Sequence, residues 1–145
     1  MLGGAISGIA AISLVHAQAV SITPEQFVWK ESLAGAVETA MVVGDAGKPA
    51  PFIMRVRFKP DMTFMPHSHP RDLQVTVLSG TLLYAEGDRF DETKLREYPA
   101  GSFFVIGANV PHYERAKTAV LFQLSGSGPQ GSTFLNPNDD PWNEH

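Results

Sequence analysis

Short runs of strand-forming residues, separated by glycine and proline turns, fill most of the chain after residue 19 and limit the folds open to it. In residues 52–58 the apolar side chains occupy every second position, which places them on one face of an extended strand. Such runs recur roughly every 8–15 residues with no amphipathic helix between them, so the pattern predicts an all-β sandwich or barrel. The other expected strands cover residues 37–43, 74–79, 81–86, 102–106, a short stretch from His112, and 119–124.

Two polar stretches are expected outside the sheets. Residues 89–98 read as an exposed loop. Residues 136–141 read as a polar tail that either wraps the surface or stays mobile.

The composition fits one folded domain. Of the 145 residues, 43% are hydrophobic and only 18% are charged, which is too few charges for a disordered chain. The net charge is −4 and the lysines and arginines occur singly, so no basic patch points to nucleic acid as a partner. The chain has no cysteine, which leaves histidine, carboxylate and amide groups as metal ligands.

Residues 1–19 have the pattern of a secretory signal peptide. They carry no charged side chain, are apolar in the centre and end in Ala17-Gln18-Ala19, an A-x-A cleavage site. The usual Lys or Arg near the start is missing, and the alternative is an apolar helix packed on the domain. The run is too short and too rich in glycine for a membrane span, which takes about 20 apolar residues. The pattern predicts export of residues 20–145 to the periplasm or beyond, with no membrane partner after cleavage.

Three of the five histidines form a candidate metal site, namely His67, His69 and His112. His67 and His69 are two residues apart, and side chains at i and i+2 of an extended chain point to the same side. Pro66 and Pro70 stiffen this segment and lower the entropy lost when it is ordered. With His112 from a neighbouring strand, three imidazoles make a facial set that suits Fe, Mn, Ni, Co, Cu or Zn and leaves positions open for water or substrate.

The sequence resembles the cupin family at these residues. Cupins carry the motifs G-x5-H-x-H-x3-4-E-x6-G and G-x5-P-x-G-x2-H-x3-N, which fall here on residues 61–80 and 101–116. The resemblance implies a single jelly-roll β-barrel, the double-stranded β-helix, formed by residues 20–145. It also implies that one divalent transition metal is held by His67, His69 and His112, and that the chain pairs as a homodimer.

Four positions of the motifs are replaced in turns, which leaves the fold expectation intact. Asp61 stands at the opening glycine, Gly107 and Asn109 replace P-x-G, and Ala116 replaces the final asparagine.

The motif glutamate is also missing. Counting back from Gly80 puts its position at Leu73, whereas counting forward from His69 puts it at Gln74. Gln74 is the expected fourth ligand through its amide oxygen, provided that a β-bulge turns it inward. The alternatives are an outward-facing Gln74 beside a strict three-histidine site, or Asp72 from a turn.

Without that glutamate, three neutral imidazoles would leave the charge of a divalent ion uncompensated. The ion would then be a stronger Lewis acid and favour an anionic ligand, or the site would have lost its metal altogether. Tyr84, Gln123 and Tyr113 are weaker candidates for contact with a ligand, and a structural role is the alternative for each.

Three functions remain open from the sequence. The first is a metalloenzyme with dioxygenase-, isomerase- or lyase-like chemistry on a small molecule, as the resemblance allows. The second is a non-catalytic sensor or carrier of a metal or small ligand. The third is a structural β-barrel with a degenerate site. Neither the metal nor the reaction follows from the residues, because the fold hosts many chemistries.

Overall fold

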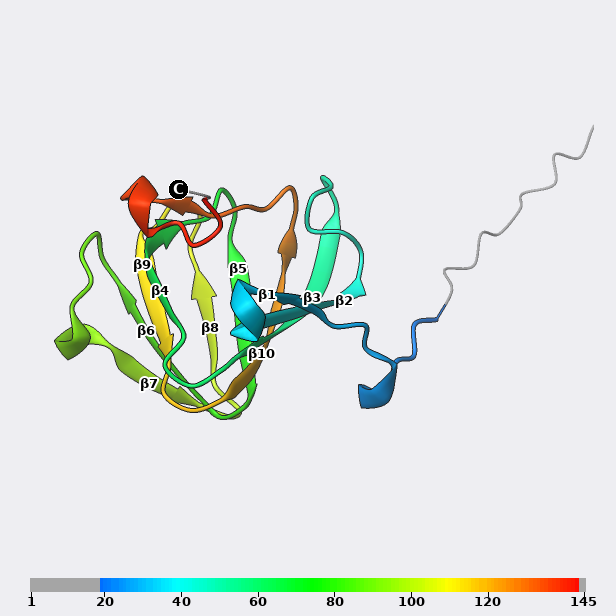
Figure 1. The fold of residues 1–145 in the computed structure, drawn as a ribbon. Helices are drawn as coiled ribbons and strands as arrows, with labels where there is room; N and C mark the ends of the chain where they lie inside the picture. Colours follow the sequence, from blue (N-terminus) through cyan, green and yellow to red (C-terminus); the bar gives the residue numbers. More distant parts are fainter. Residues whose placement is uncertain (1–18, 144–145) are drawn as a thin grey trace, which may run out of the picture.

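The computed structural model describes residues 19–143 and contains two antiparallel β-sheets that face one another (Figure 1). The six-stranded sheet has the order β1 (Lys30–Ser32), β2 (Val37–Val43), β3 (Pro51–Phe58), β10 (Val120–Ser127), β5 (Leu73–Ser79) and β8 (Phe103–Ile106). The five-stranded sheet has the order β11 (Thr133–Phe134), β4 (Thr63–Ser68), β9 (His112–Ala116), β6 (Thr81–Glu86) and β7 (Arg96–Pro99).

Only short 3-10 turns accompany these strands between residues 19 and 143: Pro24–Gln26, Leu33–Gly35, Glu92–Lys94 and Pro137–Asp139. No helix in this range is long and apolar enough to cross a membrane. The proposed signal peptide falls almost wholly on residues 1–18, outside the described residues, and stays a prediction.

The core lies between the sheets and follows the alternation of apolar residues. Leu73, Val75 and Val77 of β5 point inward and are buried. Phe58 of β3 joins the two sheets, because its ring centroid lies 5.3 Å from that of Phe64 on β4. Aromatic rings at this spacing add to the hydrophobic gain of burying them. The all-β prediction is confirmed.

The expectation for residues 89–98 is wrong in its second half. Arg96–Pro99 forms β7, the edge strand beside β6. Its polar sequence reflects its place at the edge, where Arg96 and Glu97 are exposed and only Tyr98 packs inward, against Tyr84 and Phe104. An edge strand with one solvated face lacks the apolar alternation that marks the central strands.

The substituted motif positions keep the turns of the motif. Asp61 and Asn109, which stand where the motifs have glycine, adopt φ angles of 67° and 60°. Aspartate and asparagine tolerate this left-handed region better than other residues with a Cβ atom. The turns that lead into β4 and β9 are therefore preserved, and with them the strands that carry the histidines.

Candidate metal centre

The structure brings His67, His69 and His112 to one point between the sheets. His67 on β4 pairs directly with His112 on the neighbouring β9, and His69 follows β4 by one residue. One nitrogen from each ring lies within 4.8 Å of the others. His67 is 3% exposed and His112 is 0% exposed, whereas His69 is half-buried, so two of the three rings are shielded from bulk water.

Backbone carbonyl groups fix the orientation of each ring. The Nδ1–H groups donate to the carbonyl oxygens of Met65 (2.8 Å from His67), Gly131 (2.8 Å from His69) and Val110 (2.9 Å from His112). An imidazole that donates from Nδ1 carries its lone pair on Nε2, so all three rings offer Nε2 to a metal. Outer hydrogen bonds of this kind are the usual support of metal-binding histidines.

Burial keeps the three rings neutral at physiological pH. It lowers the pKa of His67, and, together with neighbouring histidines, lowers the pKa of His69 to about 4 and that of His112 to about 3. A metal binds only the neutral form of histidine, so no proton has to leave these rings at pH 7. The Nε2 atom of His112 is buried without a hydrogen-bond partner among the described residues.

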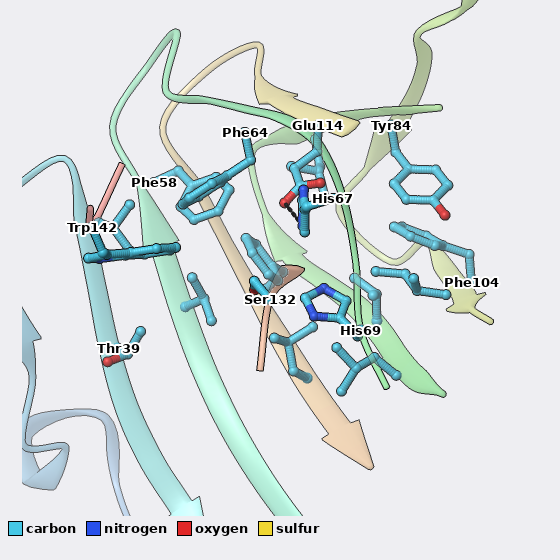
Figure 2. A pocket seen from close by; sticks show the side chains of 18 residues that line it. Thr39, Phe58, Phe64, His67, His69, Tyr84, Phe104, Glu114, Ser132 and Trp142 are labelled. Atoms are coloured by element: carbon cyan, nitrogen blue, oxygen red, sulfur yellow. Dashed lines mark ion pairs between the residues drawn. The ribbon is translucent and has the colours of Figure 1, made fainter. Parts of the chain in front are cut away.

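Glu114 places a carboxylate beside two of the three histidines, although the cluster of described residues whose ligand atoms all lie within 4.8 Å of one another consists of His67, His69 and His112 alone. Glu114 lies on β9 two residues after His112, so both side chains point into the same space. Its Oε1 lies 3.8 Å from Nε2 of His67, the pair joined in Figure 2, and its Oε2 lies 3.9 Å from Nε2 of His112. These distances are too long for hydrogen bonds. The Oε2 atom has no partner in the described protein, and burial raises the pKa of Glu114 to about 8.

The residues fit a divalent transition metal. Two donors that bind one ion at about 2.0–2.2 Å lie roughly 3–3.5 Å apart, and the Glu114 oxygens lie within about 1 Å of that spacing from two histidine nitrogens. A buried carboxyl without a partner costs free energy, which a cation between it and the imidazoles would offset. A set of three nitrogens and one carboxylate suits Fe, Mn, Co, Ni or Zn.

The expectation that Gln74 is the fourth ligand is wrong. No bulge interrupts β5 here: Leu73, Gln74 and Val75 pair in continuous register with β8. Leu73 and Val75 therefore face the core, while Gln74 is exposed on the outer face and its amide oxygen accepts a hydrogen bond from the Ser125 hydroxyl at 3.0 Å. Asp72 accepts a hydrogen bond from the Ala108 N–H at 2.7 Å and lies outside the cluster.

The expected full positive charge at a bound metal depends on whether Glu114 is one of its ligands. With Glu114 ionised, three neutral imidazoles and one carboxylate leave only one of the two charges of a divalent ion uncompensated. The signal for Glu114 was present in the sequence as His112-Tyr113-Glu114, which has the same i, i+2 spacing as His67-Ser68-His69.

Of the three weaker candidates, only Tyr84 lines the pocket at the metal centre. Gln123 lies on the outer face of β10, where its side-chain oxygen accepts from the Arg55 guanidinium at 3.4 Å. Tyr113 points away from the cluster between His112 and Glu114, and its hydroxyl donates to the carbonyl of Asp91 at 3.1 Å. The pocket expectations for Gln123 and Tyr113 are therefore wrong.

The pocket beside the histidines is small and mostly apolar. Its volume is about 150 Å³, and Figure 2 shows His67, His69 and Glu114 among the side chains that surround it. Between residues 19 and 143, no lysine or arginine belongs to its lining. The polar lining residues are Thr39, His67, His69, Tyr84, Glu114 and Ser132.

The metal-free protein is expected to be most stable near pH 6.5. Above this pH, the Glu114 carboxyl of the folded protein stays protonated until about pH 8, because its pKa is raised from 4.5 to about 8. The same group in the unfolded chain is already ionised, so the free energy of unfolding falls by about 1–2 kcal/mol between pH 6.5 and 8. Below pH 6.5, the histidines of the unfolded chain become protonated, whereas the buried rings of the folded protein stay neutral because their pKa values are lowered. The free energy of unfolding therefore falls again. Urea unfolding across this range measures both limbs. An alkaline limb that persists in Glu114→Gln would contradict the assignment.

Replacing Tyr84 by phenylalanine is expected to stabilise the ligand-free protein by about 1 kcal/mol. The Tyr84 hydroxyl is buried without a hydrogen-bond partner among the described residues, so its removal relieves a desolvation cost. Chemical denaturation measures the change, with the half-buried Tyr98→Phe as the control. A clear loss of stability in Tyr84→Phe would show that the hydroxyl is satisfied.

Comparison with known proteins identifies the fold. No family model and no curated protein sequence matches the chain. Among solved structures, the polyketide cyclase RemF from Streptomyces resistomycificus is similar, with TM-score 0.65 and 16% identity over 86% of this chain and 91% of that one. An RmlC-like cupin from Shewanella frigidimarina has a TM-score of 0.61 and 17% sequence identity, and the match covers 77% of this chain and 91% of that one. KdgF from Halomonas sp. has a TM-score of 0.59 and 18% sequence identity, and the match covers 77% of this chain and 96% of that one.

Salicylate 1,2-dioxygenase from Pseudoaminobacter salicylatoxidans, solved in complex with gentisate, is also similar, with TM-score 0.57 and 15% identity. The match covers 74% of this chain but only 31% of the dioxygenase. At these identities the likeness establishes the architecture and nothing of the activity. The chain is a cupin-fold protein, a double-stranded β-helix, with a histidine cluster able to hold a metal ion.

Proposed function

We propose that this protein is a metal-dependent enzyme that acts on a small, largely apolar compound. The ion would be held by His67, His69 and His112 through Nε2 and by Glu114 through its carboxylate. The observation that carries the proposal is the buried carboxyl of Glu114, which faces two free imidazole nitrogens and has no other partner among the described residues.

The chain's own residues prepare the site for chemistry. The Nδ1 hydrogen bonds hold the rings in place before a ligand arrives, and most of the residues that line the cavity are apolar. A bound divalent ion would supply a Lewis acid or a redox centre with open positions for an oxygen donor of the substrate. The dioxygenase and cyclase among similar structures support an enzyme of this fold.

One observation favours a non-catalytic metal or small-ligand carrier as the second candidate. Among the described residues that line the pocket, Glu114 is the one acidic side chain and none is a lysine, so Glu114 as a ligand leaves no separate carboxylate or amine there as a general base. Thermal stabilisation by a small ligand without any product would favour the carrier, whereas turnover that follows metal content would favour the enzyme.

Elemental analysis of untagged protein tests the metal proposal. After exposure to Fe, Mn, Co, Ni, Cu and Zn in turn and removal of the excess, we expect about one ion per chain for at least one metal. The matched His67→Ala/His112→Ala variant should retain none. A wild-type protein that stays metal-free with every ion would overturn the proposal.

We also propose that the protein is exported, on the strength of the A-x-A pattern at residues 17–19. Expression of the full chain in a bacterium, followed by periplasmic extraction and N-terminal sequencing, should find a mature chain that starts at Val20. An intact N-terminus in the cytoplasmic fraction would contradict this. The homodimer implied by the resemblance stays a prediction, which light scattering of the purified protein checks.

A further inference from the structure

We propose that Trp142 is the residue that determines ligand shape in this pocket, and that it selects compounds with a flat, unsaturated ring. The inference rests on the proposed metal-dependent function and names the class of compound that the site would take. It also assigns a role to the C-terminal segment, residues 131–142, which the metal centre alone does not explain.

The C-terminal segment is attached to the metal centre at several points. Its strand β11 pairs with β4, with Phe134 opposite His67. The Phe134 ring stacks on the His67 ring at 5.0 Å between centroids, and the carbonyl of Gly131 accepts the hydrogen bond of His69. The position of this segment is therefore fixed relative to two of the three histidines.

Trp142 is held at the pocket while half of its surface remains exposed. Its backbone N–H donates to a carboxylate oxygen of Asp140 at 3.0 Å. The indole stacks on Phe64 at 5.3 Å and 24°, and lies near Phe134 at 6.3 Å. Trp142 is 49% exposed although it lines the pocket, and Figure 2 shows its ring between Phe64 and Thr39. Part of the indole surface is thus free for a ligand.

The rest of the pocket favours the same shape. A cavity of about 150 Å³ matches the size that is known to hold a benzene ring in an apolar protein interior. The lining has no lysine or arginine to bind a distal charged group, whereas the histidines and Glu114 gather where an oxygen-bearing substituent would bind a metal. Besides Trp142, the aromatic lining residues are Phe58, Phe64, Tyr84, Phe104 and Phe122.

Two aromatic rings in contact gain free energy beyond that of the surface they bury. A saturated ring of equal size lacks this extra attraction. One such contact is expected to change affinity by roughly threefold to tenfold. Benzoate and cyclohexanecarboxylate form a matched pair of probes, because both carry one carboxylate and differ mainly in the flatness of the ring.

Calorimetric titration of the Zn²⁺-loaded full chain with both acids tests the inference. Wild type should bind benzoate roughly threefold to tenfold more tightly than cyclohexanecarboxylate. In Trp142→Leu this ratio should fall to roughly half of its wild-type value or less, because the other aromatic lining residues remain, and in Trp142→Phe most of it should be kept. Trp29→Leu is the control, because Trp29 stacks with Arg57 outside the pocket and its loss should leave the ratio unchanged.

A second comparison separates this inference from the metal proposal. Toluene and methylcyclohexane need no metal, so thermal stabilisation of the metal-free protein by each reports the ring preference alone. A preference for toluene that weakens in Trp142→Leu supports the inference even where no Zn²⁺ is taken up. The inference is overturned if the flat and saturated compounds bind equally in both comparisons. It is also overturned if Trp142→Leu leaves the preference for the flat ring unchanged. Neither result would contradict metal uptake.

Discussion

Replacement of His112 by alanine is expected to reduce metal affinity roughly 100- to 1,000-fold, because it removes one of four ligands from a site whose total binding energy is shared among them. His112 contributes a fully buried ring whose Nε2 has no other partner among the described residues. Competition with a chelator of known affinity measures the loss, and circular dichroism checks that the β-sheet content is kept.

The matched control is Gln123→Ala. Gln123 lies on the outer face of β10 and should leave metal affinity unchanged, although the sequence alone made it a pocket candidate. Metal binding by His112→Ala at the wild-type affinity would show that the ion is held elsewhere.

Replacement of Glu114 by glutamine is expected to lower metal affinity roughly 10- to 100-fold, because the amide keeps the shape of the carboxylate but not its charge. Glu114 should also be the source of the proton that metal uptake releases. Because its pKa is raised to about 8 in the metal-free protein, uptake at pH 7 should release about one proton in wild type and none in Glu114→Gln. Titration calorimetry in buffers of different ionisation enthalpy counts these protons.

The paired control places a carboxylate at the position that the cupin motif suggests. Gln74→Glu should neither raise metal affinity nor rescue Glu114→Gln, because position 74 is exposed on the outer face of β5. Rescue of the double variant by Gln74→Glu would mean that β5 can present position 74 to the ion, against the register observed.

The strands at residues 52–58 and 74–79 were predictable because two simple rules agree, whereas β4, which carries His67, was not among the expected strands. Alternation at residues 52–58 and 74–79 marks strands with one buried face, and the turns between them are marked by glycine, asparagine or aspartate. The spacing of His67 and His69 requires only that the chain is extended. These are local properties of the sequence, so they can be recognised without knowing which strands pair with one another.

Glu114, which we propose as the fourth ligand, was missed because the motif directed attention to one strand. The family pattern puts the glutamate on β5, where this chain has Leu73 and Gln74. In this fold β9 lies beside β4, so a residue two positions after His112 reaches the same space. In the proposed centre the carboxylate would come from the second motif, and only the pairing of β4 with β9 brings it close to His67.

The ends of the chain show where local patterns stop being informative. Residues 136–141 read as polar surface, and they do lie on the surface, yet they deliver Trp142 to the pocket. Nothing in the periodicity of this segment marks that contact, because it depends on Phe64 from β4, which is far away in the sequence. Contacts of this kind follow from the assembled fold.

The most direct measurement is anomalous diffraction from crystals of the Zn²⁺-loaded protein, collected on both sides of the zinc absorption edge. We expect one strong peak about 2.0–2.2 Å from Nε2 of His67, His69 and His112 and from one oxygen of Glu114, with Gln74 remote from it. A peak that excludes Glu114, or a saturating zinc concentration that produces no peak between these rings, would contradict the four-ligand centre.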